Sequence, residues 1–382
     1  MSHTRRNILS GLGLWGLGAG LTPVSVSAAP PVTLSKPAAL VAPFDIARAA
    51  QRVAVAKKLP ETQPVRDLNT SSRYRKDDPS RSTVDPEADD AYEASVAPLR
   101  AFSRAVVKAA NRFTRSKGVK TAAAAEAAGL LLTWARADSL KGMESETAYF
   151  SRVSTLTPAV QGWLQIAGAV EKKAEAVILA WFEERAVDTQ TYYTHLKKPV
   201  SAANNHRYWA GLSVLGTGIA CNRKDFFDWG VDCARIGIEQ VTADGALPLE
   251  LRRASRALSY HAYAAGPLVM IAEASARNGD DSLYKMNDEA LHRVVDFTLS
   301  QFDNPSLIET LAGATQGVPK RDDATNFSEV AWLEIYESRF PGRSRWSSRL
   351  SGLRPMLSTA LGGDMTLLFA RVPETLSASP KG

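Results

Sequence analysis

Residues 157–181 read TPAVQGWLQIAGAVEKKAEAVILAW. The large apolar residues of this stretch recur every three or four positions, at Trp163, Ile166, Val170, Ala174, Val177 and Trp181. That spacing is the period of one face of an α-helix. The pair Thr157-Pro158 suits a helix start, because proline is tolerated in the first turn. The stretch therefore predicts one helix whose apolar stripe packs against other helices.

The helical period extends outward from this stretch over most of the chain. Asp85 is suited to cap a helix and is followed by Pro86 and Glu87, so a long helix is expected from there to Phe113. Further helices are expected over residues 44–59, 121–138, 205–221, 226–240, 250–277, 285–302, 326–338 and 344–360. Strand-like alternation is nearly absent, so the sequence predicts an all-α fold. Antiparallel helix hairpins can form a bundle or an incomplete (α/α) barrel, that is, a toroid, and the pattern does not distinguish the two.

Residues 60–85 interrupt the helical pattern with a long polar loop. A loop of this length inside a compact domain is commonly either functional or disordered. Its basic run Ser72-Arg73-Tyr74-Arg75-Lys76, with Arg81 further on, suits a lid that covers an acidic ligand. The alternative is a solvated surface loop.

The composition is that of a globular protein with a modest excess of positive charge. Of the 382 residues 45% are hydrophobic and 23% are charged, which permits a sizeable core and argues against wholesale disorder. The formal net charge of +6 and the pI of about 9.2 favour an acidic partner, such as nucleic acid, anionic lipid or an acidic polysaccharide. So small a charge is equally consistent with basic and acidic groups that intersperse on a solvated surface.

The N-terminus has the features of an export signal. Arg5-Arg6 precede a glycine-diluted apolar run from Ile8 to Leu21 that is too short to span a bilayer, and small residues suited to cleavage follow at Val26-Ser27-Ala28. The arginine pair predicts a twin-arginine (Tat) signal and delivery to the periplasm or beyond, with no membrane contact of the mature chain. The expected organisation is a Tat signal at 1–28, a flexible leader at 29–43, one domain at 44–360 that includes the lid loop, and a C-terminal tail at 361–382.

The two cysteines, Cys221 and Cys233, could form one disulfide in an exported chain. Both lie in helical patterns, and Tat substrates generally fold in a reducing cytoplasm, so we expect two buried thiols. Three histidines, His195, His261 and His292, are interpreted as structural.

Two clusters of polar residues stand out against the alanine- and leucine-rich helices. The first is the run Asn204-Asn205-His206-Arg207-Tyr208-Trp209. In the second, Arg253, Arg256 and Tyr260 fall at positions i, i+3 and i+7 and would share one helix face. Taken singly, these residues could equally be helix caps, an ordinary polar helix face or core aromatics.

Together these residue types suit removal of a proton that lies next to a carboxylate, as in elimination across C4–C5 of a uronic acid. Loss of the C5 proton adds negative charge beside the carboxylate, so that carboxylate must first be neutralised. Arg253 can bind it bidentately, and Asn205 and His206 add further donors. Tyr260 becomes a usable base where nearby cations stabilise its phenolate. No metal or cofactor is required, and no clustered set of metal ligands is evident in the sequence.

The two clusters and the loop resemble polysaccharide lyase family 5, the alginate lyases. The resemblance is carried by Asn-Asn-His-Arg-Tyr-Trp at 204–209, by Asp-Gly-Ala-Leu-Pro-Leu-Glu-Leu at 244–251 with the run 253–263, by Ser-Arg-Tyr at 72–74 with Arg-Ser-Thr at 81–83, and by Trp-Leu-Glu at 332–334. It extends over about residues 44 to 355 and implies an (α/α) toroid with a lid. Arg73 stands where lysine is common in that family, a departure that bears on substrate preference.

The resemblance also implies roles for individual residues. Asn205 and Arg253 would neutralise the C5 carboxylate with help from His206, and Tyr260 would take the C5 proton and return one to the glycosidic O4. Further substrate contacts are implied for Arg73, Tyr74, Arg81, Trp209 and Tyr263. One residue can do both proton transfers where proton and leaving group share a face, as in mannuronate, so the implied partner is mannuronate-rich alginate. We expect a monomer that binds no nucleic acid.

Other classes of protein make different demands on the sequence. A glycoside hydrolase needs two carboxylates at working separation, and Asp228, Asp232 and Glu250 have no matched partner in the sequence. A non-catalytic polyuronate-binding protein would be expected to lack Tyr260 or Arg253, and both are present. A polyglucuronate lyase or broad polyuronate lyase would share the same mechanism.

Overall fold

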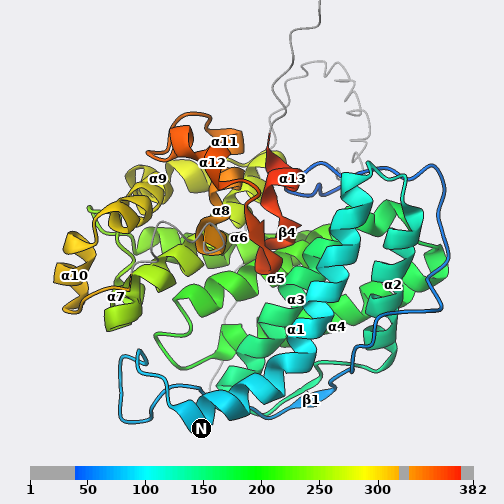
Figure 1. Ribbon diagram of the computed structural model, residues 1–382, viewed down its shortest axis with the longest axis horizontal. Helices are drawn as coiled ribbons and strands as arrows, with labels where there is room; N and C mark the ends of the chain where they lie inside the picture. The colour runs from blue at the N-terminus through cyan, green and yellow to red at the C-terminus, as the bar shows by residue number, and fades with distance from the viewer. Residues whose placement is uncertain (1–38, 318–326, 371–382) are drawn as a thin grey trace, which may run out of the picture. The chain divides into compact units, whose positions relative to one another are not determined.

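The computed structural model describes residues 39–317 and 327–370 (Figure 1). The expected export signal at 1–28, most of the expected leader and the residues from 371 onward lie outside the described residues. Within the described part, none of the helices combines the length and hydrophobicity that a membrane span requires. The same residues contain no group of three or more His, Cys, Asp or Glu side chains placed to hold a metal ion.

The long helices of residues 39–370 form an inner and an outer layer (Figure 1). In the inner layer α1 contacts α3, α3 contacts α5 and α5 contacts α8, while α2, α4, α6 and α9 pack behind them. The inner helices are α1 (Pro86–Arg115), α3 (Glu146–Ile166), α5 (Asn205–Cys221) and α8 (Ala257–Arg277). The outer helices are α2 (Thr121–Arg136), α4 (Lys172–His195), α6 (Lys224–Glu239) and α9 (Ser282–Asp303). This alternation of inner and outer helices is an (α/α) toroid and confirms the all-α prediction.

Short elements connect and flank these helices. Two strand pairs are formed, β1 (Asp67–Leu68) parallel to β2 (Gly142–Met143), and β3 (Leu357–Ser358) antiparallel to β4 (Gly363–Asp364). The short helices are α7 (Pro248–Leu251), α10 (Ser306–Ala312), α11 (Leu333–Arg339), α12 (Leu350–Leu353) and α13 (Met365–Phe369). The 3₁₀ turns are η1 (Ala167–Ala169), η2 (Ala254–Arg256), η3 (Phe327–Val330), η4 (Ser347–Arg349) and η5 (Thr359–Leu361).

The C-terminal segment packs beside the inner helices instead of forming a tail. η5 contacts α1, α3 and α8, and α13 contacts α1 and α11. Met365 is fully buried in the core. The domain therefore extends to residue 370, and the expected boundary at 360 is wrong. The expected single helix over 344–360 is also wrong, because η4, α12, β3 and η5 divide that stretch.

The stretch 157–181 forms parts of two helices and not the one that its period predicts. α3 ends at Ile166, and α4 begins at Lys172 after the turn η1. Between them the backbone of Val53 bonds to the chain on either side of Val170, with Val53 N donating to Ala169 O at 2.7 Å and Glu171 N donating to Val53 O at 2.9 Å. In α4 the buried apolar residues include Ala174, Ile178 and Trp181, whereas Val177 is 37% exposed, so the predicted stripe continues with Ile178 in place of Val177. A pairing with a segment more than a hundred residues away cannot be read from local periodicity.

The helix expected over residues 44–59 is absent, and the described chain there is irregular and extended. Phe44 is buried at 2% exposure, and Ala56 N donates to Ala125 O of α2 at 3.0 Å. The end of the expected flexible leader is likewise attached to the helical body. Leu40 N donates to Asn222 Oδ1 at 2.9 Å, which fixes the chain before it enters the domain.

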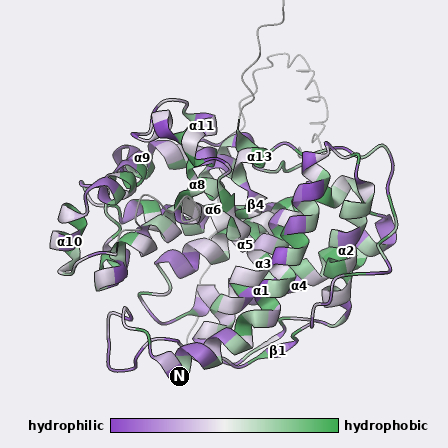
Figure 2. Ribbon diagram, in the orientation of Figure 1, coloured by the Kyte–Doolittle hydropathy of each residue, from purple (hydrophilic) through white to green (hydrophobic). Residues whose placement is uncertain are grey.

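α1 illustrates how local sequence sets an inner helix. Asp85 accepts a hydrogen bond from Ala88 N at 3.1 Å and thereby caps the helix, and Pro86 occupies its first turn. The buried residues include Leu99, Phe102 and others that recur at helical spacing. Figure 2 shows hydrophilic and hydrophobic residues alternating along α1, whereas α2 is coloured mostly as hydrophobic. The N-terminal start of α1 thus agrees with the prediction, and its end lies two residues beyond Phe113.

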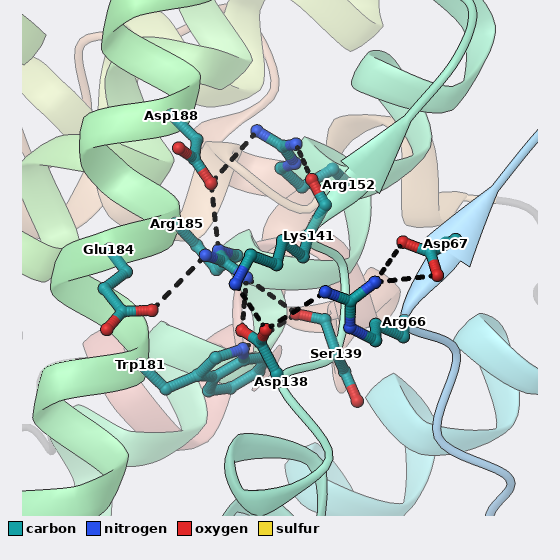
Figure 3. Close-up of polar contacts among 10 residues, drawn as sticks. All are labelled: Arg66, Asp67, Asp138, Ser139, Lys141, Arg152, Trp181, Glu184, Arg185 and Asp188. Atoms are coloured by element: carbon teal, nitrogen blue, oxygen red, sulfur yellow. Dashed lines mark hydrogen bonds and ion pairs between the residues drawn. The ribbon is translucent and has the colours of Figure 1, made fainter.

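A network of ion pairs fixes the start of the lid loop to the helical body (Figure 3). Arg185 of α4 is 3% exposed and lies 3.0 Å from Asp138 and 3.1 Å from Asp188. Arg66, beside β1, reaches the same Asp138 at 3.6 Å. A buried guanidinium is stable only where carboxylates accompany it, so these groups hold each other in place. Because β1 also pairs with β2, and Asp85 at the far end of the loop caps α1, both ends of the loop are anchored.

Cysteine and histidine predictions are largely confirmed by the structure. Cys221 and Cys233 are both free thiols; Cys233 is buried as predicted, whereas Cys221 is only partly buried. Burial raises the pKa of each thiol to about 12. His261 is fully buried, accepts a hydrogen bond from Leu247 N at 2.9 Å and has its second ring nitrogen 2.8 Å from Ala257 O, as a structural histidine does. His292 is also buried, with Nδ1 at 2.6 Å from the Tyr336 hydroxyl.

Candidate active site

A cleft of about 290 Å³ lies among the inner helices and the lid loop. Helices α1, α3, α5 and α8 and the lid all contribute side chains to it. Of the residues predicted from sequence it is lined by Arg73, Tyr74, Arg81, Asn205, His206, Arg253, Tyr260 and Tyr263. Residues that lie far apart in the sequence are thus brought together at one place.

Asn205 begins α5, where the preceding Asn204 caps the helix by accepting from His206 N at 3.1 Å. The Asn205 carboxamide is held from behind by Glu250 of α7, which is fully buried. Asn205 Nδ2 donates to one Glu250 oxygen and Asn205 N donates to the other, each at 2.8 Å. Burial raises the pKa of Glu250 to about 7, while the two hydrogen bonds from Asn205 and the charge of Arg253 act in the opposite direction. The bond to Glu250 fixes the orientation of the Asn205 carboxamide. Its Oδ1 has no hydrogen-bond partner among the described residues.

His206 follows Asn205 and stacks on Phe150 of α3, with ring centroids 4.2 Å apart. Burial lowers the pKa of His206 to about 4, Glu146 opposes this shift, and Arg253 and Arg81 reinforce it. At neutral pH the imidazole is therefore uncharged. Within the described part of the chain Nδ1 has no hydrogen-bond partner. His206 can thus contribute a neutral donor or acceptor to a ligand, but little positive charge.

Arg253 and Tyr260 contact each other directly in the cleft. Arg253 Nη2 donates to the Tyr260 hydroxyl at 2.8 Å, and the guanidinium lies 3.9 Å from the centroid of the Tyr260 ring. Burial raises the pKa of Tyr260 above its ordinary value, and Arg253 acts against that rise. The hydroxyl is therefore protonated at rest, with a cation placed to stabilise it once the proton leaves.

The predicted continuous helix through 250–277 is wrong, although its residues still meet. α7 ends at Leu251, the 3₁₀ turn η2 follows, and α8 begins at Ala257. Arg253 therefore precedes the turn while Tyr260 lies in the first part of α8. The shared face comes from the fold of this corner and not from a single helix.

The lid reaches over the cleft and bonds to its catalytic candidates. Tyr74 and Tyr260 share a hydrogen bond between their hydroxyls at 3.0 Å, and Arg256 Nη1 donates to the Tyr74 hydroxyl at 2.9 Å. The backbone oxygen of Arg81 accepts from Arg253 Nη2 at 2.5 Å. The Arg81 side chain is exposed at the cleft. The loop at 60–85 is thus a lid in contact with the site.

The remaining predicted contacts differ in position. Arg73 lines the cleft but is paired with Asp89 and Glu93 of α1 at 2.6 and 3.3 Å. Tyr263 lines the cleft, and the centroid of its ring is 6.4 Å from those of Tyr260 and Phe150. Trp209 does not line the cleft: it is 3% exposed and packs behind Tyr263, with centroids 4.8 Å apart. Trp209 therefore supports the ring of Tyr263 and is not placed to make the predicted contact with substrate.

Sequence reasoning missed several residues of the site. The cleft is also lined by Ser72, Tyr92, Glu146, Thr147, Phe150, Arg256, Ser259 and Glu329. Arg256 stood in the noted polar cluster, and Glu250 lies three residues before Arg253, so proximity to a functional arginine was an available signal for both. For Tyr92 and Phe150 the sequence offers no such signal, because they belong to α1 and α3 and reach the site only through the packing of the toroid.

The fold and the cleft together define a helical-toroid protein with a cationic, tyrosine-bearing site of the kind found in polysaccharide lyases. Residues 69–308 match the sequence profile of the alginate lyases. The chain belongs to the alginate lyase family. It is 32% identical over 312 residues to an alginate lyase of Pseudomonas fluorescens strain Pf-5, covering 79% of this chain and 81% of that protein. It is 33% identical over 310 residues to an alginate lyase of Pseudomonas putida strain GB-1, covering 79% and 82%.

Solved structures agree on the fold. The crystal structure of alginate lyase A1-III from Sphingomonas species A1 matches with a TM-score of 0.69 at 24% identity, covering 83% of this chain and 86% of that one. A variant of that lyase in complex with a tetrasaccharide matches with a TM-score of 0.71, covering 82% and 86%. These similarities confirm the (α/α) toroid.

Proposed function

We propose that this protein is an alginate lyase that cleaves mannuronate-rich chains by β-elimination, giving 4,5-unsaturated oligouronates. The observation that carries the proposal is the 2.8 Å bond from Arg253 to the Tyr260 hydroxyl, set beside polar atoms without partners in the described chain. Those atoms are Asn205 Oδ1, His206 Nδ1 and Arg253 Nε. A cleft that combines such atoms with arginines is suited to an anionic, hydroxyl-rich ligand.

The first step is neutralisation of the C5 carboxylate. Arg253 offers a guanidinium for it, and the second N–H of Asn205 Nδ2, the one not given to Glu250, offers a neutral donor. His206, which also lines the cleft, adds a hydrogen bond to the same carboxylate. With its charge met in this way, the carboxylate can accept the electron density that develops when C5 loses its proton.

Tyr260 acts as the base in its phenolate form, reached when its hydroxyl proton passes to solvent. The phenolate takes the C5 proton and then returns that proton to the O4 of the leaving sugar. Arg253 donates a hydrogen bond to the Tyr260 oxygen, and Tyr74, which shares a hydrogen bond with Tyr260, can only donate once Tyr260 is a phenolate. Arg256 donates in turn to Tyr74, so negative charge on Tyr260 is stabilised by two cations. The pair of electrons from the C5–H bond forms the C4–C5 double bond, and the C4–O4 bond breaks. The same residue serves as base and acid because in mannuronate both groups lie on one face.

The experiment that tests the proposal compares initial rates on polymannuronate, polyguluronate and polyglucuronate, measured by the ultraviolet absorbance of the unsaturated product. The proposed function requires the fastest rate on polymannuronate. A faster rate on polyglucuronate would favour the second candidate, a polyglucuronate lyase, for which the presence of Arg73 in the lid is the specific observation. Absence of unsaturated product from all three would overturn both.

We propose further that the protein is exported through the Tat pathway to the periplasm. The support is the sequence at Arg5-Arg6 and the apolar run after it, which lie outside the described residues. In that compartment the enzyme would meet anionic polysaccharide directly. Free thiols at Cys221 and Cys233 accord with folding before export in a reducing cytoplasm.

A further inference from the structure

The excess positive charge of this protein is concentrated in one segment. Residues 94–120 contain seven basic residues and no acidic one. The whole chain has 46 basic and 40 acidic residues, so outside this segment 39 basic residues stand against 40 acidic ones. The segment forms most of α1 and the turn after it. The mechanism described above uses none of its cations.

These cations lie on the exposed side of α1 and extend away from the cleft. Positions 104, 108, 112 and 115 are three or four residues apart, which places them on one face of the helix, and two exposed lysines follow in the turn. We call this group the basic tract; it consists of Arg104, Lys108, Arg112, Arg115, Lys117 and Lys120. α1 has 30 residues and is therefore about 45 Å long. The cleft residue Tyr92 lies near its start, so the tract ends at the opposite end of the helix from the cleft (Figure 1).

Most of the basic tract has no counter-charge. Arg112 pairs with Glu126 at 2.7 Å, and Arg115 pairs with Asp364 at 2.8 Å. For the other four side chains, the described residues provide neither an ion pair nor a hydrogen bond. Exposed cations of one sign repel each other, so an anionic surface that meets them is attracted strongly.

Exposed apolar side chains lie at the end of the tract. Val119, between the two lysines of the turn, is 79% exposed, the largest value among the exposed large hydrophobic residues of the described chain. Gly118 lies against the backbone of Arg48, so close that a Cβ on this glycine would be 2.3 Å from Arg48 O. That contact brings the segment of Arg48 and Ile46 to the same turn, and Ile46 is 41% exposed. Two apolar side chains are thus exposed to solvent beside the cations.

We propose that the basic tract, with Val119 at its end, docks on the surface of an anionic phospholipid bilayer. The cations would meet lipid phosphates, and Val119 would enter the boundary between headgroups and acyl chains. A water-soluble polyanion such as a uronate chain offers charge but no such apolar layer. Docking of this kind needs no membrane-spanning helix, and it leaves the cleft at the other end of α1 open to polymer. The proposal goes beyond the proposed function and departs from the sequence-based expectation that the mature chain makes no membrane contact.

Vesicle sedimentation tests the proposal. The exported protein, which lacks the apolar run of the expected signal, is mixed with phosphatidylcholine vesicles that contain about one third phosphatidylglycerol, and separately with pure phosphatidylcholine vesicles. Wild type should bind the anionic vesicles and not the neutral ones. Lys117→Gln combined with Lys120→Gln should weaken partitioning about thirtyfold, the equivalent of about 2 kcal/mol for two cations. Val119→Ser should weaken it about tenfold, because it removes most of an apolar side chain.

Arg136→Gln combined with Lys197→Gln is the matched control for charge. Both residues are exposed; Arg136 ends α2, whose first residue follows the tract, and Lys197 lies in the loop that leads to Asn205 of the cleft. Their replacement therefore removes the same charge at a distance from the tract. Val187→Ser, at a 47% exposed valine of α4, is the control for the apolar side chain. Both controls should bind anionic vesicles as wild type does, and a thermal melt of every variant checks that it is folded.

Two results would overturn the docking surface: a wild type without preference for anionic vesicles, and a loss in the tract variants no larger than in their controls. If the double lysine variant instead binds polymannuronate more weakly and vesicles as before, the tract binds polysaccharide and the lipid proposal is wrong. Vesicle binding does not depend on lyase activity, so failure of the docking surface and failure of the proposed function are distinguishable.

Discussion

Tyr260 is the residue on which the proposed mechanism depends most. Tyr260→Phe removes the hydroxyl that transfers both protons but keeps the ring packed beside Tyr263. General acid–base catalysis contributes on the order of 10² to 10⁴ per role, so kcat should fall by at least about 10³-fold. KM and the melting temperature should change little. Steady-state kinetics on polymannuronate with a thermal melt of each protein are the measurements.

Arg253→Ala provides the contrast. The guanidinium meets the carboxylate before and during the reaction, so KM should rise while kcat falls. A Tyr260→Phe enzyme that keeps more than a tenth of the wild-type kcat would mean that another residue is the base. The neutral imidazole of His206 would then be the leading candidate.

Ionisation of Glu250 should determine how activity rises on the acidic side of the pH profile. Only the ionised carboxylate can accept both N–H groups of Asn205, and its pKa is raised to about 7, so activity should rise as the pH increases through that value. The charged and titratable groups around it are Arg253, Tyr208 and Tyr263, and burial raises the pKa of both tyrosines above the ordinary range. Glu250→Gln should lower kcat and abolish this limb. A variant with the wild-type pH profile would contradict the role.

The same shift has a consequence for stability. Because the folded state binds the Glu250 proton more tightly than the unfolded chain does, its contribution to stability declines as the pH rises toward about 7. Glu250→Gln has no carboxyl group to ionise at this position, so its stability does not decline for this reason. Its melting temperature relative to wild type should therefore increase between about pH 5 and about pH 8.

At the scale of single elements, local sequence predicted those features that depend on neighbouring residues. The Asp85 cap and the bounds of α5 follow from local signals, because capping and helical period are properties of consecutive residues. The break after Ile166 and the extended chain at 44–59 depend on backbone pairing with remote segments, as at Val53. Pairing of this kind cannot be predicted from the neighbouring residues in the sequence.

Asp78 holds the tip of the lid, and its replacement tests whether the lid's shape matters. Its two oxygens accept hydrogen bonds from the backbone or hydroxyl groups of Ser80, Ser82 and Thr83, which hold the pKa of Asp78 well below its usual range. Arg81, inside this turn, has a left-handed φ of 51° and presents its carbonyl to Arg253. Asp78→Asn replaces one acceptor oxygen by a donor and should loosen the turn, raising KM for polymannuronate several-fold.

Asp77→Asn is the control for the lid. Asp77 is the adjacent carboxylate, exposed and paired with Arg75 at 2.7 Å, so its removal changes the charge of the lid by the same amount. KM should stay near the wild-type value. Equal effects of the two variants would show that charge matters and the shape of the turn does not.

At the scale of the whole molecule, the sequence predicted which residues line the cleft better than it predicted how they are arranged. The motif resemblance named Asn205, His206, Arg253 and Tyr260, which all line one cleft. It could not place Trp209, which packs behind the cleft, because a tryptophan that binds a sugar and one that supports a tyrosine look alike in sequence. It also set the end of the domain too early, since a short C-terminal segment closes the ring through packing alone.

The proposed export through the Tat pathway depends on the N-terminal residues. Replacing Arg5 and Arg6 by lysine keeps the charge but removes the pair that the Tat pathway recognises, so precursor should accumulate in the cytoplasm. Cell fractionation followed by immunoblotting measures this. Undiminished lyase activity in the periplasmic fraction of the variant would rule out the Tat route.

The last prediction concerns the response of the whole enzyme to salt. Binding of a polyanion brings carboxylates toward Arg73 and Arg81 of the lid, which line the cleft, so added ions should screen the attraction. KM for polymannuronate should rise as the ionic strength increases. The rise should be smaller for the trimer, because it carries fewer carboxylates than the polymer does. In contrast, kcat at saturating substrate should change little, since Arg253 and Tyr260 act inside a cleft that the substrate and the lid cover. A KM independent of salt would show that shape and uncharged hydrogen bonds, and not the cations of the cleft, hold the chain.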